Sequence, residues 1–319
     1  MVIYMIIRLG YACLSKTIDI TTSRTISYTN YLKLNEEEKY KKLDELIRSN
    51  LNSLESLIDY NIKNNIHFFR LSSGLIPLAT LKDVEFDYIN PYKDIYKKIG
   101  LKIKENNIRV DFHPDQFTVL NSTKKEIVDN SIYSLNYHYS ILKSLDIENL
   151  IILLHVGSSV LGKENSIKRF INSFNRLPDY LKKCIAIEND DKTYNILDVL
   201  ELCKKINVPM ILDYHHYICN KGDININDYY EEIFSTWKKL KPKIHFSSPK
   251  NKTKKEIRHH HNYINSDDFI SFIESIKHLN TDIDIMIEAK GKDEAVFKLV
   301  RELKFKTNYR FIDETTFEV

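Results

Sequence analysis

The chain has 319 residues, of which 43% are hydrophobic and 29% are charged. This is the composition of a globular protein with a sizeable core, and it excludes disordered and fibrous proteins. The 47 Lys and Arg residues outnumber the 44 Asp and Glu residues by three, and a net charge of +3 is too small to indicate nucleic-acid binding by itself.

Eight short apolar segments follow one another along the chain, and each is predicted to be a β-strand. They are Ile3–Leu9, Ile66–Leu71, Ile108–Phe112, Leu150–Val156, Cys184–Glu188, Pro209–Tyr214, Lys243–Phe246 and Ile283–Glu288. Their apolar residues are continuous rather than alternating, which is typical of parallel strands buried on both faces.

A helical segment is predicted after each strand. The helices are expected over residues 35–64, 91–106, 124–145, 166–181, 197–206, 227–240, 267–279 and 293–304. The first has a capping box formed by Asn35 and Glu38. The alternation predicts an α/β fold, a (β/α)8 TIM barrel that forms a single domain over residues 1–319. The competing architecture, an open doubly wound sheet, is placed second because a Gly-rich first turn is absent.

No export signal or membrane segment is evident in the sequence. The N-terminal apolar run, Val2 to Ile7, ends at Arg8, and no apolar run reaches about 18 residues. The four cysteines form no C-x-x-C pair and are interpreted as reduced thiols. We therefore expect a soluble cytoplasmic protein.

Ionisable side chains stand where the predicted strands end. In a barrel, catalytic groups come from the carboxyl ends of the strands. In chain order these ends carry Arg8 with Tyr11, Arg70 with Ser73, His113 with Gln116, His155, Glu188 with Asp191, Asp213 with His215 and His216, Lys243 with His245, and Glu288 with Lys290. Imidazole or carboxylate groups from six strands are thus expected to converge on one face.

Such a group of buried ionisable side chains is costly unless its members are paired or bound to metal. Mixed His and carboxylate ligands suit Zn, Mn or Fe better than Ca or Mg. There are more candidates than one ion needs, so we expect more than one metal, an arrangement that serves phosphoryl displacement.

The basic segment Lys250–His261 is predicted to be a loop. It is interpreted either as a solvated loop or as a contact for a phosphate backbone beside the metals. One histidine of His259, His260 and His261 would then reach the metals, and one of His215 and His216 would ligate while the other packs. Two aromatic rings, Tyr11 and Phe117, follow strand ends on the same face, where they can stack on bases.

Nine segments, in order and spread over almost the whole chain, carry a resemblance to a known family. They are RLGYACLS at Arg8–Ser15, FRLSSGLIPL at Phe69–Leu78, DFHPDQFTVLNS at Asp111–Ser122, LLHVGS at Leu153–Ser158, IENDD at Ile187–Asp191, LDYHH at Leu212–His216, KIHFSSP at Lys243–Pro249, HHNYI at His260–Ile264 and IMIEAKGKD at Ile285–Asp293. With these segments the sequence resembles the UV damage endonuclease (UVDE-type) family.

The resemblance implies a TIM barrel of the endonuclease IV-like and xylose-isomerase-like kind. It also implies a metal-dependent DNA repair endonuclease that incises the phosphodiester immediately 5′ of UV photoproducts and so initiates alternative excision repair. The implied substrates are cyclobutane pyrimidine dimers and 6-4 photoproducts in double-stranded DNA, with abasic sites as a secondary class. The implied cofactor is a cluster of divalent metal ions, Mn²⁺ with Zn²⁺ or Mg²⁺ as alternatives. The enzyme is expected to act as a monomer, associated with the nucleoid in a bacterium.

The resemblance also assigns roles to residues. It implies as metal ligands His113, His155, Glu188, Asp213, His216, His245, His260 and Glu288. Lys243, Glu188, Glu288 and His245 are the implied catalytic residues, with Lys243 either an ammonium that binds phosphate or, if carboxylated, a further anionic ligand. The implied contacts to DNA and lesion are Tyr11, Ser73, Gln116, Phe117, Lys250 and Arg258. Among the three consecutive histidines, His260 is chosen because it precedes Tyr263 by three residues.

Two residues depart from the family pattern. Gly74 stands where a polar or ligating side chain is expected, and Ser15 stands where Asn is common. Two other functions remain alternatives: a metal-dependent sugar isomerase, which shares the strand-end residues, and a damaged-DNA-binding protein that has lost catalysis, which Gly74 suggests.

Overall fold

The central feature of the computed structural model, which describes residues 4–251, 253 and 256–319, is a closed barrel of eight parallel strands. The strands run in the order β2-β3-β4-β5-β6-β7-β8-β1, and β1 pairs with β2 to close the ring. Their bounds are β1 Ile6–Ala12, β2 Phe68–Leu71, β3 Arg109–Phe112, β4 Ile152–His155, β5 Ile185–Glu188, β6 Met210–Asp213, β7 Lys243–Phe246 and β8 Ile283–Ile287. The predicted barrel is therefore confirmed.

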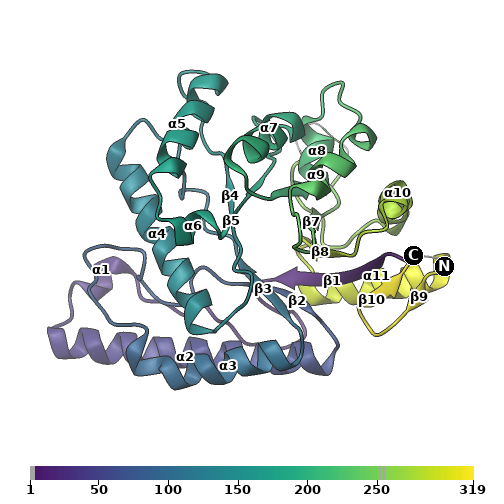
Figure 1. The fold of residues 1–319 in the computed structure, drawn as a ribbon. Helices are drawn as coiled ribbons and strands as arrows, with labels where there is room; N and C mark the ends of the chain where they lie inside the picture. Colours follow the sequence, from purple (N-terminus) through teal and green to yellow (C-terminus); the bar gives the residue numbers. More distant parts are fainter. Residues whose placement is uncertain (1–3, 252, 254–255) are drawn as a thin grey trace.

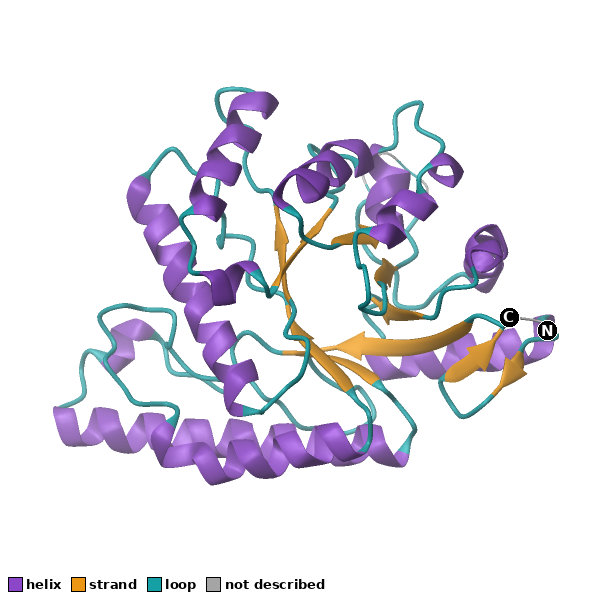
Figure 2. Ribbon diagram, in the orientation of Figure 1, coloured by secondary structure: helices purple, strands orange, loops and turns teal. Residues whose placement is uncertain are grey.

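Helices surround the strands on the outside of the barrel (Figures 1 and 2). Their bounds are α1 Tyr28–Tyr31, α2 Glu36–Lys63, α3 Lys93–Glu105, α4 Lys125–Ser144, α5 Lys163–Asn175, α6 Asp179–Lys182, α7 Ile196–Ile206, α8 Tyr214–Asn220, α9 Tyr230–Ser235, α10 Ser266–Ile276 and α11 Lys292–Lys306, with single 3-10 turns at Asn90–Tyr92, Ile226–Asp228 and Lys277–Leu279. Asn35 caps α2 with the predicted capping box. Among the described residues no helix is both long and apolar enough to cross a membrane.

The first strand differs from its prediction. It spans Ile6–Ala12 rather than Ile3–Leu9, so Arg8 lies in its first half and not at its end; Ile3 itself lies outside the described residues. Gly10, which comes directly after the predicted strand, lies inside the observed one. A Cβ at this position would stand 2.1 Å from the carbonyl oxygen of Phe68, so only glycine allows β2 this close.

Replacing Gly10 with alanine is therefore expected to destabilise the fold. The obstacle is backbone rather than a movable side chain, and we expect a loss of about 3 kcal/mol, the upper end of the usual cost of overpacking. Urea unfolding of Gly10→Ala measures it. Gly74→Ala is the matched control, since the atom nearest to its Cβ would be the Cβ of Ser23 at 3.2 Å, a side-chain atom in a loop. Equal stability of the two variants would contradict this account of β1.

Four further segments depart from the predicted elements. The helix expected over residues 166–181 is divided into α5 and α6 by Pro178, and the helix expected over 227–240 is reduced to α9. A short helix, α8, follows β6 directly and contains His215 and His216. A C-terminal hairpin, β9 (Arg310–Phe311) and β10 (Thr316–Glu318), was not predicted. β10 pairs antiparallel with β1 (Figure 1). Beside this pairing, Met5 and Val319 exchange backbone hydrogen bonds.

A buried ion cluster lies at the amino ends of the strands. Asp284, which has no exposed surface, accepts hydrogen bonds from Arg8 at 2.6 and 2.9 Å and from Arg109 at 3.0 Å. The Arg109 guanidinium also lies 5.2 Å from the ring centroid of Trp237. A second group of buried ionisable side chains lies at the carboxyl ends of the strands, at the opposite end of the barrel.

Candidate metal centre

Six strands deliver imidazole or carboxylate groups to the carboxyl end of the barrel. The contributing residues are His113 after β3, His155 at the end of β4, Glu188 at the end of β5, Asp213 at the end of β6, His245 in β7 and Glu288 after β8. They meet because parallel strands of a barrel end at one face. The predicted convergence is confirmed.

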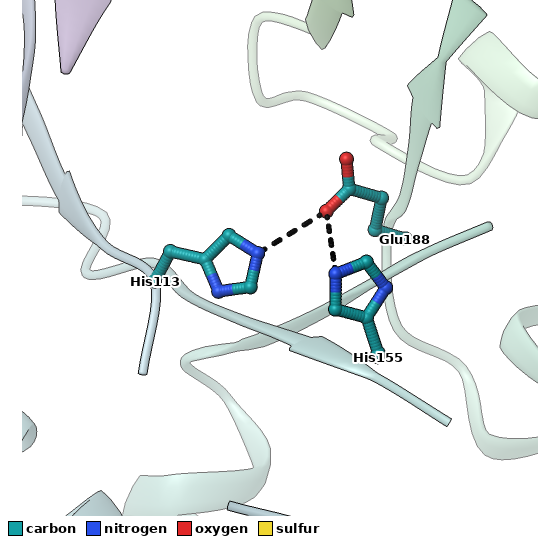
Figure 3. A group of neighbouring side chains, drawn as sticks. All are labelled: His113, His155 and Glu188. Atoms are coloured by element: carbon teal, nitrogen blue, oxygen red, sulfur yellow. Dashed lines mark ion pairs between the residues drawn. The ribbon is translucent and has the colours of Figure 1, made fainter. Parts of the chain in front are cut away.

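Glu188 lies at the centre of this group. Its Oε2 is 3.4 Å from His113 Nε2 and 3.5 Å from His155 Nε2 (Figure 3). Its Oε1 is 2.6 Å from His245 Nδ1 and 3.8 Å from His216 Nδ1. The two oxygens of one carboxylate therefore face different sets of histidines.

The ligand atoms form three groups, each small enough to surround one ion, and Glu188 belongs to all three. The groups are His113 with His155 and Glu188, Glu188 with Asp213 and His216, and Glu188 with His245 and Glu288. A carboxylate shared in this way can bridge neighbouring ions. The arrangement can hold a cluster of divalent metals.

Backbone carbonyls orient three of the predicted histidine ligands through Nδ1. The contacts are His113 Nδ1 to Pro114 O at 2.9 Å, His216 Nδ1 to Asn189 O at 2.9 Å and His260 Nδ1 to Glu288 O at 2.6 Å. A carbonyl only accepts, so each Nδ1 carries the proton and each Nε2 keeps its lone pair for a metal.

The charges of the site favour a cation. Burial opposes ionisation of Glu188, but the neighbouring His245 and His155 outweigh it and hold its pKa well below the usual range. Burial also raises the pKa of Asp213 well above the usual range, and the charges of Glu188 and Glu288 add to that rise. A cation bound at the site would favour the ionised form of Asp213.

Unpartnered polar atoms also indicate that the site can hold divalent metals. Three buried polar atoms of the site, Glu188 Oε2, Asp213 Oδ2 and His155 Nδ1, have no hydrogen-bond partner among the described residues. Buried polar atoms without partners are rare in native proteins. The two carboxylate oxygens face the centre of the site, where metal ions would satisfy them.

Beneath the ligands, Arg70 in β2 joins two of them. Its guanidinium donates to Glu288 Oε1 at 2.6 Å and to His245 Nε2 at 2.7 Å. A guanidinium only donates, so Nε2 of His245 accepts, and Nδ1 carries the proton and donates it to Glu188 Oε1 at 2.6 Å. For a metal to bind Nδ1, the ring would have to lose that proton. Arg70 appeared in the sequence only as a strand-end residue, and its part as a link between ligands was missed.

Lys243, predicted to be catalytic, is enclosed below this layer. Its side chain has no exposed surface, and its Nζ lies 2.5 Å from Asp111 Oδ2. Burial lowers the pKa of Lys243 to about 8, against the opposing effect of Asp111. Asp111 was not singled out in the sequence, although a carboxylate inside an apolar strand is the signal that could have found it.

The predicted lesion-contacting loop lies at the surface. Gln116 and Phe117 are exposed, and the Phe117 side chain is 76% exposed. Asp115 Oδ1 accepts the Phe117 backbone amide at 2.8 Å and so shapes the turn. Ser73, another predicted contact, donates its hydroxyl to the carbonyl of His113 at 2.9 Å.

Tyr11 does not lie where it was predicted. It belongs to the interior of β1, is completely buried and donates its hydroxyl to Asn61 at 2.8 Å. Tyr11 was predicted to follow the end of the strand, with its ring free to stack on bases. This prediction is wrong, because the predicted strand began and ended three residues too early. Ser15, which departs from the family pattern, is also buried and donates to Asp293 at 2.6 Å.

The basic segment is described only in part, since Lys252, Lys254 and Lys255 lie outside the described residues. Lys250 pairs with Glu256 at 2.5 Å, and Arg258 lies 3.4 Å from Asp191. Their contacts to DNA remain predictions. His260 is half-buried with its ring 6.5 Å from that of His216, whereas His259 and His261 are exposed.

The two histidines that follow β6 have different surroundings, as the sequence suggested. His215 is buried and packs, with Nδ1 2.7 Å from Ser247 Oγ and Nε2 2.6 Å from the carbonyl of Ile257. His216 faces the carboxylates of Asp213 and Glu188. The sequence analysis did not identify the role of Asn189. The side-chain amide of Asn189 accepts a hydrogen bond from the backbone N–H of Asp213 at 2.9 Å and donates one to its carbonyl at 3.0 Å. These two bonds fix the end of β6.

Comparison with known proteins places the chain in one family. The sequence matches the family described as UV-endonuclease UvdE over residues 7–316. The chain belongs to this UV-endonuclease family. It is therefore an endonuclease, a hydrolase that acts on DNA. It is 40% identical over 303 residues to the UV DNA damage endonuclease of Bacillus cereus (strain B4264), covering 94% of this chain and 95% of the relative.

Solved structures agree with the membership in the UV-endonuclease family. The crystal structure of SacUVDE superposes with a TM-score of 0.84 at 34% identity, over 94% of this chain and 98% of the other. Endonuclease IV from Thermus thermophilus superposes with a TM-score of 0.57 at 10% identity, over 93% and 98% of the two chains, which shows a shared barrel fold. Family membership favours the endonuclease over the sugar isomerase among the functions that the sequence left open.

Proposed function

We propose that the protein is a metal-dependent endonuclease that cuts double-stranded DNA immediately 5′ of UV photoproducts and starts their excision. The observation that carries this proposal is the carboxylate of Glu188, which is common to three groups of ligand atoms at the open end of the barrel. Cyclobutane pyrimidine dimers and 6-4 photoproducts are the proposed substrates, and abasic sites are a secondary class.

The metal ions would be held by His113, His155, Asp213, His216, His245, His260 and the two glutamates, Glu188 and Glu288. Divalent ions supply Lewis acidity and activated water for the displacement at phosphorus. Mn²⁺ is the proposed metal, because mixed imidazole and carboxylate ligands suit it. Zn²⁺ and Mg²⁺ are the alternatives.

The residues of the chain itself prepare this chemistry. Arg70 holds Glu288 and His245 in place through hydrogen bonds of 2.6 and 2.7 Å, and its charge remains next to the carboxylates throughout. Lys243 and Asp111 lie below, at the closed side of the site. These fixed charges require no rearrangement when charge develops on the phosphoryl oxygens.

Selection of damaged DNA would rest on the loop that follows β3. A photoproduct weakens base stacking. Moving the damaged bases out of the duplex therefore costs less free energy than the few kcal/mol needed to unstack and unpair a normal base. Gln116 and the exposed ring of Phe117 would occupy the space that the bases leave. Lys250 and Arg258 would exchange their partners Glu256 and Asp191 for backbone phosphates.

The test is incision of an end-labelled duplex with one cyclobutane pyrimidine dimer, in the presence of Mn²⁺, Mg²⁺ or Zn²⁺. We expect one product whose length places the cut directly 5′ of the dimer, and no cut in the undamaged duplex. Folded protein that leaves the damaged duplex intact with every metal would overturn the proposal. Specific binding of the lesion without incision would favour the damaged-DNA-binding protein instead.

Phe117→Ala is expected to lower incision of the damaged duplex by roughly 5–100-fold at subsaturating DNA, because the stacking of one ring on a base is worth about 1–3 kcal/mol. Mn²⁺ affinity should be unchanged, since the ring lies outside the ligand groups. The control is Phe305→Ala, which removes a ring that is 90% exposed at the far end of α11. Equal losses in the two variants would remove Phe117 from lesion recognition.

A further inference from the structure

A cleft at the amino ends of the strands carries an excess of positive charge. It has a volume of about 290 Å³, and its wall contains five cationic side chains and three carboxylates. The cationic residues are Arg8, Lys104, Arg109, Lys239 and Lys241, and the acidic ones are Asp146, Glu148 and Asp284. Two positive charges are therefore unbalanced, at the end of the barrel opposite the metal centre.

The innermost charges of this cleft are fixed in place. Arg8 and Arg109 both bond to Asp284, and their side chains are only 10% and 17% exposed. Arg109 is further held between aromatic rings, 5.6 Å from the centroid of Phe68 and 5.2 Å from that of Trp237. Fixed cations of this kind bind an anion with little loss of side-chain entropy.

Several N–H groups that face the cleft donate no hydrogen bond among the described residues. Arg109 bonds through Nη1 only, and its Nε and Nη2 donate no hydrogen bond within the described part of the chain. Lys241 Nζ lies 3.9 Å from Asp284 Oδ1, which is too far for a hydrogen bond. Burial lowers the pKa of Lys241; the carboxylates of Asp284 and Asp282 attract its charge, and the charges of Arg8 and Arg109 oppose them.

We propose that this cleft is a binding site for a phosphate group, held by Arg8, Arg109 and Lys241. Guanidinium forks match the tetrahedral oxygens of phosphate, and an ammonium adds a point charge. The excess of two positive charges equals the charge of a phosphate dianion. The site is independent of the catalytic activity, because it lies at the other end of the barrel.

The experiment measures thermal unfolding of the metal-loaded protein in orthophosphate and in chloride of equal ionic strength. For wild type we expect phosphate to raise the Tm by about 2–4 °C at ten times its dissociation constant. Lys241→Met should lose most of this rise. Lys205→Met is the matched control, because Lys205 is an exposed lysine near the end of α7, on the same end of the barrel but outside the cleft.

Phosphate that binds at the metal centre would raise the Tm of both variants alike, so only the difference between them reports the cleft. Equal shifts in Lys241→Met and wild type, or no shift in wild type, would overturn the proposal. Deoxyadenosine 5′-monophosphate in a parallel series identifies the source of the phosphate group. A larger shift with the nucleotide assigns a nucleotide end, and an equal or smaller shift assigns free phosphate; both outcomes support the site.

Discussion

Replacing Glu188 with glutamine is expected to abolish metal binding and incision together. The side chain is 1% exposed and belongs to every group of candidate ligands, so the substitution removes one negative charge from all of them at once. Substitution of residues that merely support a ligand costs about 10–100-fold in metal affinity. We therefore expect Mn²⁺ to bind Glu188→Gln more than about 100-fold more weakly.

Titration calorimetry with Mn²⁺ measures this effect directly, and thermal unfolding gives a second readout, because bound metal raises the Tm of the wild type. The control is Glu201→Gln, which makes the same chemical change at an exposed position of α7. Wild-type Mn²⁺ affinity in Glu188→Gln would mean that the carboxylate is not the shared ligand. Lost incision with intact Mn²⁺ binding would restrict Glu188 to catalysis.

Replacing Asp284 with asparagine is expected to cause the largest loss of stability. Asp284 is completely buried, and its carboxylate lies between Arg8, Arg109 and Lys241. Asparagine keeps the shape but leaves Arg8 and Arg109 without the carboxylate to which both bond, next to the charge of Lys241. Breaking a buried pair from one side costs about 3–5 kcal/mol, and we expect a loss of this size in urea unfolding.

The matched control for this substitution is Glu302→Gln at the surface. Glu302 pairs with Lys298 at 3.7 Å, and both side chains are more than 30% exposed, so its removal should change the stability by less than about 0.5 kcal/mol. A similar small effect in Asp284→Asn would show that water screens the cations at the barrel end. That result would also remove the support for a phosphate site in the cleft, which depends on these charges.

The sequence predicted most of the barrel and of the metal centre because both depend on local patterns. Continuous apolar runs located the strands, and the polar residues at the ends of those strands included His113, Asp213 and Glu288. Tyr11 was misplaced because the limits of β1 depend on a contact between Gly10 and Phe68, residues that are far apart in the chain. The links from Arg70 to Glu288 and from Lys243 to Asp111 likewise join different strands. No spacing along the chain indicates which strands will face each other across the barrel.

The pairing of β1 has a consequence for folding. The first half of β1 lies between β8 and β10, and only its last residues pair with β2. β8 begins at Ile283 and β10 at Thr316, so both are far from β1 along the chain. Pairings across so many residues form slowly. Until the distal segments arrive, β1 presents apolar residues and unpaired backbone groups as an open edge, the feature through which partly folded chains associate. Production of the protein should therefore be more vulnerable to aggregation during folding than its finished barrel would suggest.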